Sequence, residues 1–125
     1  MRTLVVMAAV FGALGVALGA FGAHGLAGYF ADNPAAEATF ETAVRYHLIH
    51  AVALLGAAWA YERFPSRWTR YAGWLFVAGI LLFSGSLYLL SLLNLRFMGA
   101  VAPLGGASLI AGWLCLGLAA WQAEK

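Results

Sequence analysis

Four long apolar stretches, separated by short polar segments, dominate the pattern of the 125-residue chain. A helix needs about 20 predominantly apolar residues to cross the roughly 30 Å hydrocarbon core of a bilayer. Each stretch has about that length, and together they cover residues 4–23, 40–61, 71–93 and 101–121. Because lipid offers no partner to open backbone groups, each span is expected to be helical. The pattern therefore predicts an all-α membrane protein, a single domain over 1–125 with four transmembrane helices in an up-down bundle.

Composition supports the bilayer as the surrounding solvent. Hydrophobic residues make up 64 % of the chain and charged residues 10 %, whereas a soluble domain carries about a quarter charged residues. A domain this small cannot hide so much apolar surface from water.

The first stretch is longer than the roughly 7–15 apolar residues of a signal peptide, so we expect it to be a retained span. With a net charge of +2 and no basic stripe, nucleic acid is not an expected partner.

Basic residues indicate how the bundle is oriented. With four spans, both termini and the middle connection lie on one side of the membrane. That side carries most of the basic residues, namely Arg2, Arg63, Arg67, Arg70 and Lys125. The opposite side carries Arg96, together with Arg45 near the start of the second span. Because cytoplasmic loops are enriched in lysine and arginine, we expect both termini in the cytoplasm.

Small residues recur on one face of the first and fourth spans. They are Gly12, Gly15, Gly19 and Gly22 in the first, and Gly105, Ser108, Gly112, Cys115 and Ala119 in the fourth. Helices in lipid associate through such small residues, which allow close backbone approach. Two interpretations are open: contact inside one bundle, or contact with a second copy or a larger membrane complex. The single cysteine can form no internal disulfide, and we expect it to serve in helix contact.

Polar side chains within spans are costly and mark function or buried hydrogen bonds. We predict a polar cluster in the outer half of the bundle, and the candidate ligand-binding residues are His24, Arg45, His47, His50, Ser84, Ser86 and Tyr88. His47 and His50 are three residues apart and share a helix face. In the outer segment before the second span, residues 32–34 (Asp-Asn-Pro) indicate a turn. Glu41 and Arg45 are four residues apart and can form an ion pair.

Four interpretations of this cluster are open. The histidines can be neutral and hydrogen-bonded, with a structural role only. A haem or metal site would use His24 with His47, which lie at comparable depth. A proton or ion path would use the histidines without a mid-membrane carboxylate. A lipid or quinone headgroup site would use Arg45 and His24 as donors. We expect no bound cofactor, and without a nucleophile–base set or phosphate loop we expect no enzyme.

Several motifs resemble the domain-of-unknown-function 423 family, which includes transmembrane protein 256-like proteins. They are GAFGAHGL over 19–26, FETAVRYH over 40–47 with His50, LFSGSLY over 82–88, and APLGG over 102–106. The resemblance implies a small four-span protein of the bacterial inner, or plasma, membrane, and it implies no catalytic roles. From the polar cluster in the outer half of the bundle, we expect an accessory or ligand-binding membrane protein. The alternative is a small oligomeric transporter or proton-handling protein.

Overall fold

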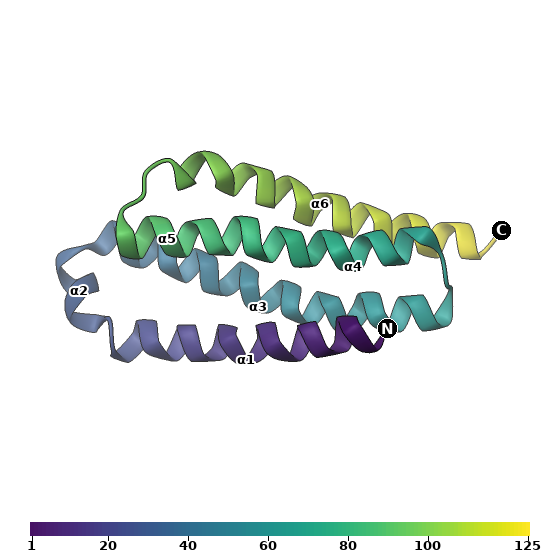
Figure 1. Ribbon diagram of the computed structural model, residues 1–125, viewed down its shortest axis with the longest axis horizontal. Helices are drawn as coiled ribbons and strands as arrows, with labels where there is room; N and C mark the ends of the chain where they lie inside the picture. The colour runs from purple at the N-terminus through teal and green to yellow at the C-terminus, as the bar shows by residue number, and fades with distance from the viewer.

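The computed structural model describes residues 1–125 as a bundle of long helices without strands (Figure 1). The elements are α1 (Arg2–His24), α2 (Ala27–Asp32), α3 (Pro34–Arg63), α4 (Arg67–Gly79), η1 (Ile80–Ser84), α5 (Gly85–Leu93) and α6 (Met98–Ala123). The segments α4, η1 and α5 follow one another without a break and form one rod. Both termini lie at the same end of the bundle, and α2 lies at the opposite end (Figure 1). We call these the termini end and the α2 end.

Four helices are long and apolar enough to cross a membrane, and they confirm the predicted all-α four-span fold. They are α1, α3, the α4–η1–α5 rod and α6. The second is the longest: α3 begins at Pro34, where a proline in the first turn loses no helical hydrogen bond. Its 30 residues correspond to about 45 Å at 1.5 Å per residue. It therefore exceeds the roughly 30 Å hydrocarbon core.

Two elements were not anticipated from the sequence. The outer segment contains the short helix α2, and Asn33 separates it from α3, at the position of the predicted turn. Phe30 of α2 is buried, and the Tyr29 hydroxyl donates a hydrogen bond to the Ser91 carbonyl of α5 at 2.7 Å. The third span contains the π-helical turn η1. Thus α2 packs across one end of the bundle, while η1 lies at the middle of the rod.

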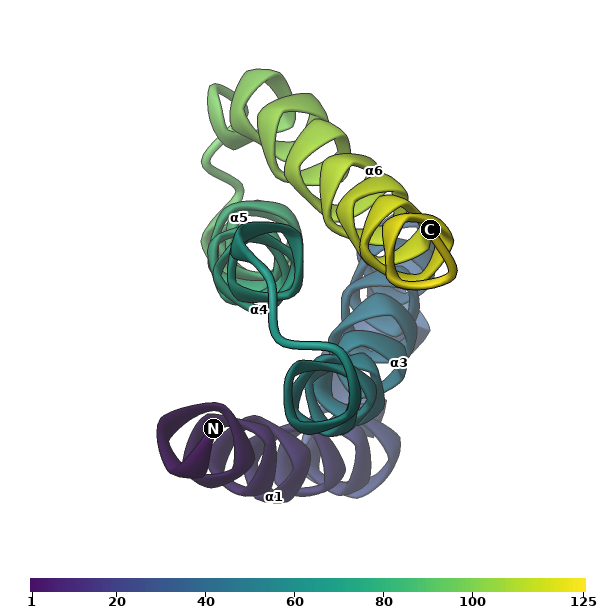
Figure 2. The same ribbon diagram turned by 90° about the vertical axis from the view of Figure 1, so that its right-hand side faces the viewer.

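The spans form an open row and not a closed ring (Figure 2). Helix α1 packs mainly on α3, which also packs on the α4–η1–α5 rod, and α6 packs mainly on α4 and η1. Alanines on α3 and α4 are buried where the central helices meet, and Leu54 of α3 is fully buried. Phe76 of α4 is fully buried too, with its ring against His50 of α3 and Trp113 of α6. The outer helices α1 and α6 leave large apolar side chains such as Val16 and Leu114 exposed. A lipid environment accommodates this surface, because it requires no polar cover.

Glycines mark the contacts of both outer helices within the chain. On α1, a Cβ added to Gly15, Gly19 or Gly22 would meet side chains of α3, whereas at Gly12 it would meet open space. On α6, Gly105 lies directly against the backbone of Leu82 and Phe83 in η1. Beside it, the Ser108 hydroxyl donates to the Leu75 carbonyl of α4 at 2.8 Å, and Gly112, Cys115 and Ala119 are also buried.

Candidate functional site

His47 lies in the middle of α3 with only 4 % of its surface exposed. Its Nδ1 shares a hydrogen bond of 2.8 Å with the Tyr88 hydroxyl of α5. The Phe11 ring of α1 meets the imidazole edge-on, with 5.9 Å between ring centroids. The other ring nitrogen, Nε2, is buried and has no partner within 3.5 Å, although the Phe11 backbone of α1 lies close enough to interact with the imidazole. A polar atom in this state is uncommon in folded proteins, because leaving it unpaired costs roughly 1–3 kcal/mol.

His50 lies one turn further along α3 and has both ring nitrogens paired. Its Nδ1 lies 2.7 Å from the Tyr46 carbonyl, which can only accept, so Nδ1 carries the proton. Nε2 is then free to accept a hydrogen bond from the Trp113 indole N–H of α6 at 3.0 Å. The neutral imidazole is therefore fully satisfied and ties α3 to α6. Sequence reasoning missed Trp113; its signal was an indole N–H inside a span, which needs an acceptor when buried.

The two serines of the predicted cluster bond to backbone carbonyls. Ser84, at the end of η1, donates to the Ala43 carbonyl of α3 at 2.7 Å. Ser86 donates to the Phe83 carbonyl one turn earlier at 2.8 Å. The Ser84 hydroxyl thus links two spans, whereas the hydrogen bond of the Ser86 hydroxyl stays within the α4–η1–α5 rod. Neither hydroxyl bonds to a histidine.

His24 and Arg45 lie apart from the buried histidines. His24 ends α1 with an exposed side chain, and Arg45 is exposed on α3. No three side chains of histidine, cysteine, aspartate or glutamate come together in a way that could hold a metal ion. The structure therefore joins His47 with Tyr88 but does not gather all seven predicted residues into one site.

A pocket of about 270 Å³ opens at the α2 end between α1, α2 and α3. It combines charged side chains with an aromatic and glycine lining: Glu37, Glu41, Arg45, Phe30, Phe40, Gly19 and Gly22. We call it the outer pocket. The Phe30 and Phe40 ring centroids are 5.4 Å apart, and a Cβ added to Gly22 would overlap the Phe40 ring. Glycines on α1 therefore let the aromatic wall of α3 approach closely.

The outer pocket and the buried histidine are connected through one aromatic contact. The Phe40 ring lies 5.3 Å from the Tyr88 ring, measured between centroids, and Tyr88 bonds to His47. Of the predicted residues, Arg45 lines the pocket directly, whereas Glu37 and Glu41 were not in the predicted set. The four-residue spacing of Glu37, Glu41 and Arg45 was the signal that could have found them, because such residues share one helix face.

Comparison with known proteins gives a consistent assignment. Residues 18–106 match the family described as "Protein of unknown function (DUF423)". The UPF0382 membrane protein YwdK of Bacillus subtilis is 40% identical over 121 residues, covering 96% of this chain and 97% of its own. The UPF0382 inner membrane protein YgdD of Escherichia coli is 40% identical over 112 residues, covering 90% of this chain and 84% of its own. A UPF0382 membrane protein of Staphylococcus haemolyticus is 39% identical over 118 residues, covering 93% of both chains.

No solved structure matches the chain significantly. The family match spans all four motifs noted in the sequence, and the relatives share nearly the full length. Together with the four spans, they establish an integral membrane protein. The chain therefore belongs to the DUF423 family, whose relatives here are UPF0382 membrane proteins.

Proposed function

We propose that this protein binds a small amphipathic molecule and holds its polar group in the outer pocket. The observation that carries this proposal is the meeting of one guanidinium and two carboxylates with two buried phenylalanines around a single cavity. Ligand pockets commonly combine an apolar lining with a few convergent polar groups. No catalytic step is part of the proposal.

The depth of the pocket suits an amphiphile. Tyr61 marks the termini end of α3, and aromatic residues of this kind prefer the membrane interface. Twenty residues of helix separate it from Glu41, which corresponds to about 30 Å and to the thickness of the hydrocarbon core. Glu41 is then at the opposite edge of the core, and Arg45 is about 6 Å deeper. The pocket opens where headgroups meet acyl chains.

The charges favour a ligand with an anionic group and an amine. Arg45 presents a planar guanidinium, which suits phosphate or carboxylate. Glu37 and Glu41 are carboxylates that can accept hydrogen bonds from an ammonium group. Glu41 and Arg45 line the same pocket without forming the ion pair expected from their spacing, since no nitrogen–oxygen distance between them is within 4.0 Å. Both remain available to a ligand.

The test is to identify what the purified protein carries. We would solubilise wild type and Arg45→Gln in mild detergent and measure bound small molecules by native mass spectrometry. Wild type is expected to retain an amphiphile that Arg45→Gln loses. The matched control is Arg96→Gln, because Arg96 lies in the α5–α6 connection at the same end but outside the pocket. Equal retention by both variants and wild type would contradict the proposal.

The His47–Tyr88 pair supports a second candidate function, proton handling. A buried imidazole with one unpaired nitrogen is a group that can accept or release a proton through a transient partner. Proton flux into liposomes after a pH jump would test it. If the protein conducts protons through His47, His47→Gln should abolish the flux. His24→Gln, a change at an exposed histidine, should leave the flux intact. No flux above empty liposomes would exclude it.

We also infer that the termini end faces the cytoplasm and that the chain resides in the bacterial inner membrane. Support comes from the basic residues at that end and from the printed name of the Escherichia coli relative as an inner membrane protein.

A further inference from the structure

A groove runs along the outside of the bundle between α3 and α6, near the termini end. The two helices make few contacts with each other, and the groove between them has a volume of about 430 Å³. Its lining includes Gly56 of α3 and Gly117 of α6, together with Trp59 and Trp113. A Cβ added to either glycine would have no neighbour within 4 Å. The groove is therefore an open, apolar channel facing the acyl chains, and we call it the α3–α6 groove.

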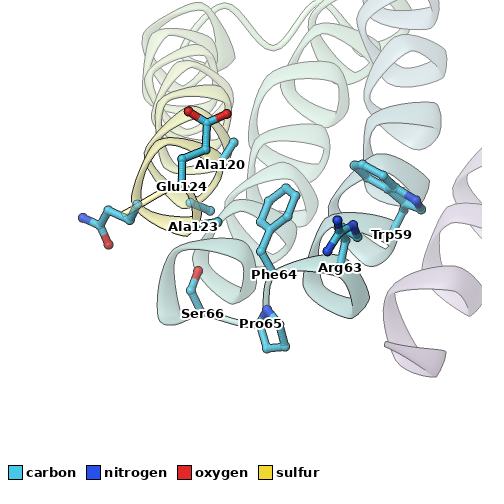
Figure 3. Close-up of a pocket in the computed structure, with 10 residues that line it drawn as sticks. Trp59, Arg63, Phe64, Pro65, Ser66, Ala120, Ala123 and Glu124 are labelled. Carbon is cyan, nitrogen blue, oxygen red and sulfur yellow. The ribbon is translucent and has the colours of Figure 1, made fainter.

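At the termini end the α3–α6 groove leads into a polar pocket of about 710 Å³ (Figure 3). The two cavities share Trp59, Phe64 and Ala120. The polar pocket adds Arg63 and Ser66 from the α3–α4 region and Glu124 from the end of α6. In Figure 3 these residues come from two sides, with Trp59, Arg63 and Phe64 on one and Ala120, Ala123 and Glu124 on the other.

The polar groups of this combined cavity are gathered at one end. At the deep end, the Trp113 indole N–H already donates to His50. At the termini end, the Ser66 hydroxyl accepts from the Thr69 backbone N–H as a helix cap. Arg63 is the only cation of the lining, and Glu124 is the only carboxylate. An occupant must therefore be apolar along its length and polar at one end, where Arg63 can bind an anionic group and Glu124 an ammonium group.

We propose that the α3–α6 groove binds one glycerophospholipid of the surrounding bilayer, with an acyl chain over Gly56 and Gly117 and its phosphate at Arg63. An arginine guanidinium can bind phosphate oxygens with two parallel hydrogen bonds. The exposed indoles of Trp59 and Trp113, 64% and 47% exposed, flank the chain. A partner helix would cover the apolar channel only, whereas a phospholipid headgroup can also bring a phosphate to Arg63 and, when it carries an amine, an ammonium group to Glu124. Charge therefore favours the lipid.

The experiment measures phospholipid binding to delipidated protein by native mass spectrometry. Dioleoyl-phosphatidylglycerol and dioleoyl-phosphatidylethanolamine would be titrated separately, because both carry the phosphate but differ in net charge. The Arg45→Gln variant, which lacks the guanidinium of the outer pocket, is expected to bind one lipid. Gly117→Leu and Gly56→Leu fill the groove and should weaken binding by about tenfold or more, and Arg63→Gln by about tenfold. The two leucine variants add a side chain into open space, so they should fold.

Matched controls separate the groove from general lipid contact. Gly12→Leu also places a leucine in open space, but on α1, and Arg67→Gln removes a nearby charge that does not line the pocket. Both should bind as wild type does. A second measurement uses a variant in which all tryptophans except Trp59 and Trp113 are changed to phenylalanine. It records how far brominated phospholipid quenches the fluorescence of these two tryptophans. Gly117→Leu should reduce that quenching.

Three outcomes would overturn the proposal. The first is unchanged lipid binding in both groove variants. The second is an equal loss in Gly12→Leu. The third is a cross-link from the groove to a second polypeptide that Gly117→Leu abolishes. The outer pocket is tested separately, since Arg45→Gln should leave groove binding unchanged.

Discussion

Replacing Gly105 with alanine is expected to destabilise the bundle, because its Cβ would overlap backbone and not a movable side chain. The added atom would lie 2.6 Å from the Phe83 Cα and from the Leu82 carbonyl carbon. Carbon atoms at optimal contact are about 3.5–4.0 Å apart. Helix α6 must therefore move away from η1 by about 1 Å. Few other positions in the chain leave so little freedom to adjust.

The magnitude follows from what that movement disturbs. Overpacking a tight contact typically costs about 1–3 kcal/mol. The same shift would lengthen the Ser108–Leu75 hydrogen bond from 2.8 Å until it breaks. Losing such a bond in a membrane costs about 0.6 kcal/mol of stability. Alanine has a higher helix propensity than glycine, which offsets up to about 1 kcal/mol of this loss of stability. We expect a net loss of about 1–3 kcal/mol in the free energy of unfolding.

The assay is reversible unfolding in mixed detergent micelles, followed by circular dichroism. Gly12→Ala is the control, because its Cβ meets open space, and it should match wild type or exceed it slightly. Gly15→Ala should be intermediate, since its Cβ meets the flexible Leu48 side chain at 2.5 Å. If Gly105→Ala is as stable as Gly12→Ala, the close backbone contact between α6 and η1 does not exist in the membrane.

Three further predictions test other features. Tyr88→Phe removes the partner of His47 and should lower the unfolding free energy by about 0.6–1.7 kcal/mol; a double-mutant cycle with His47→Ala should show coupling, and additive effects would refute the hydrogen bond. Trp113→Phe removes the donor to His50 and should cost a similar amount in the same assay, whereas Trp121→Phe, at an exposed position, should cost almost nothing. Green fluorescent protein fused after Lys125 should fluoresce, whereas alkaline phosphatase fused at the same position should be inactive. The reverse pattern would place the termini end outside the cytoplasm.

The sequence predicted the spans well because lipid imposes a length and a polarity that hydropathy measures directly. It could not reveal α2, whose six residues carry too short a pattern, or η1, which lies where α6 approaches closely at Gly105. Within the candidate site, counting residues from a span's end gives the depth of a side chain, and this predicts His47 and Tyr88 in one polar cluster in the outer half of the bundle. Depth does not say which way a side chain points around the helix. For that reason the sequence predicts His24 and Arg45 in the same cluster as His47 and His50, although the structure exposes both.

The row-like order of the spans has a consequence for how the protein is made. Since α1 packs mainly on α3 and α6 mainly on α4 and η1 (Figure 2), the chain divides at the connection around Pro65 into two helical hairpins. Stable helices can insert before they associate, so each hairpin can enter the bilayer during synthesis as its own unit. We expect the two halves, expressed as separate polypeptides, to reassemble through the contact of α3 with the α4–η1–α5 rod.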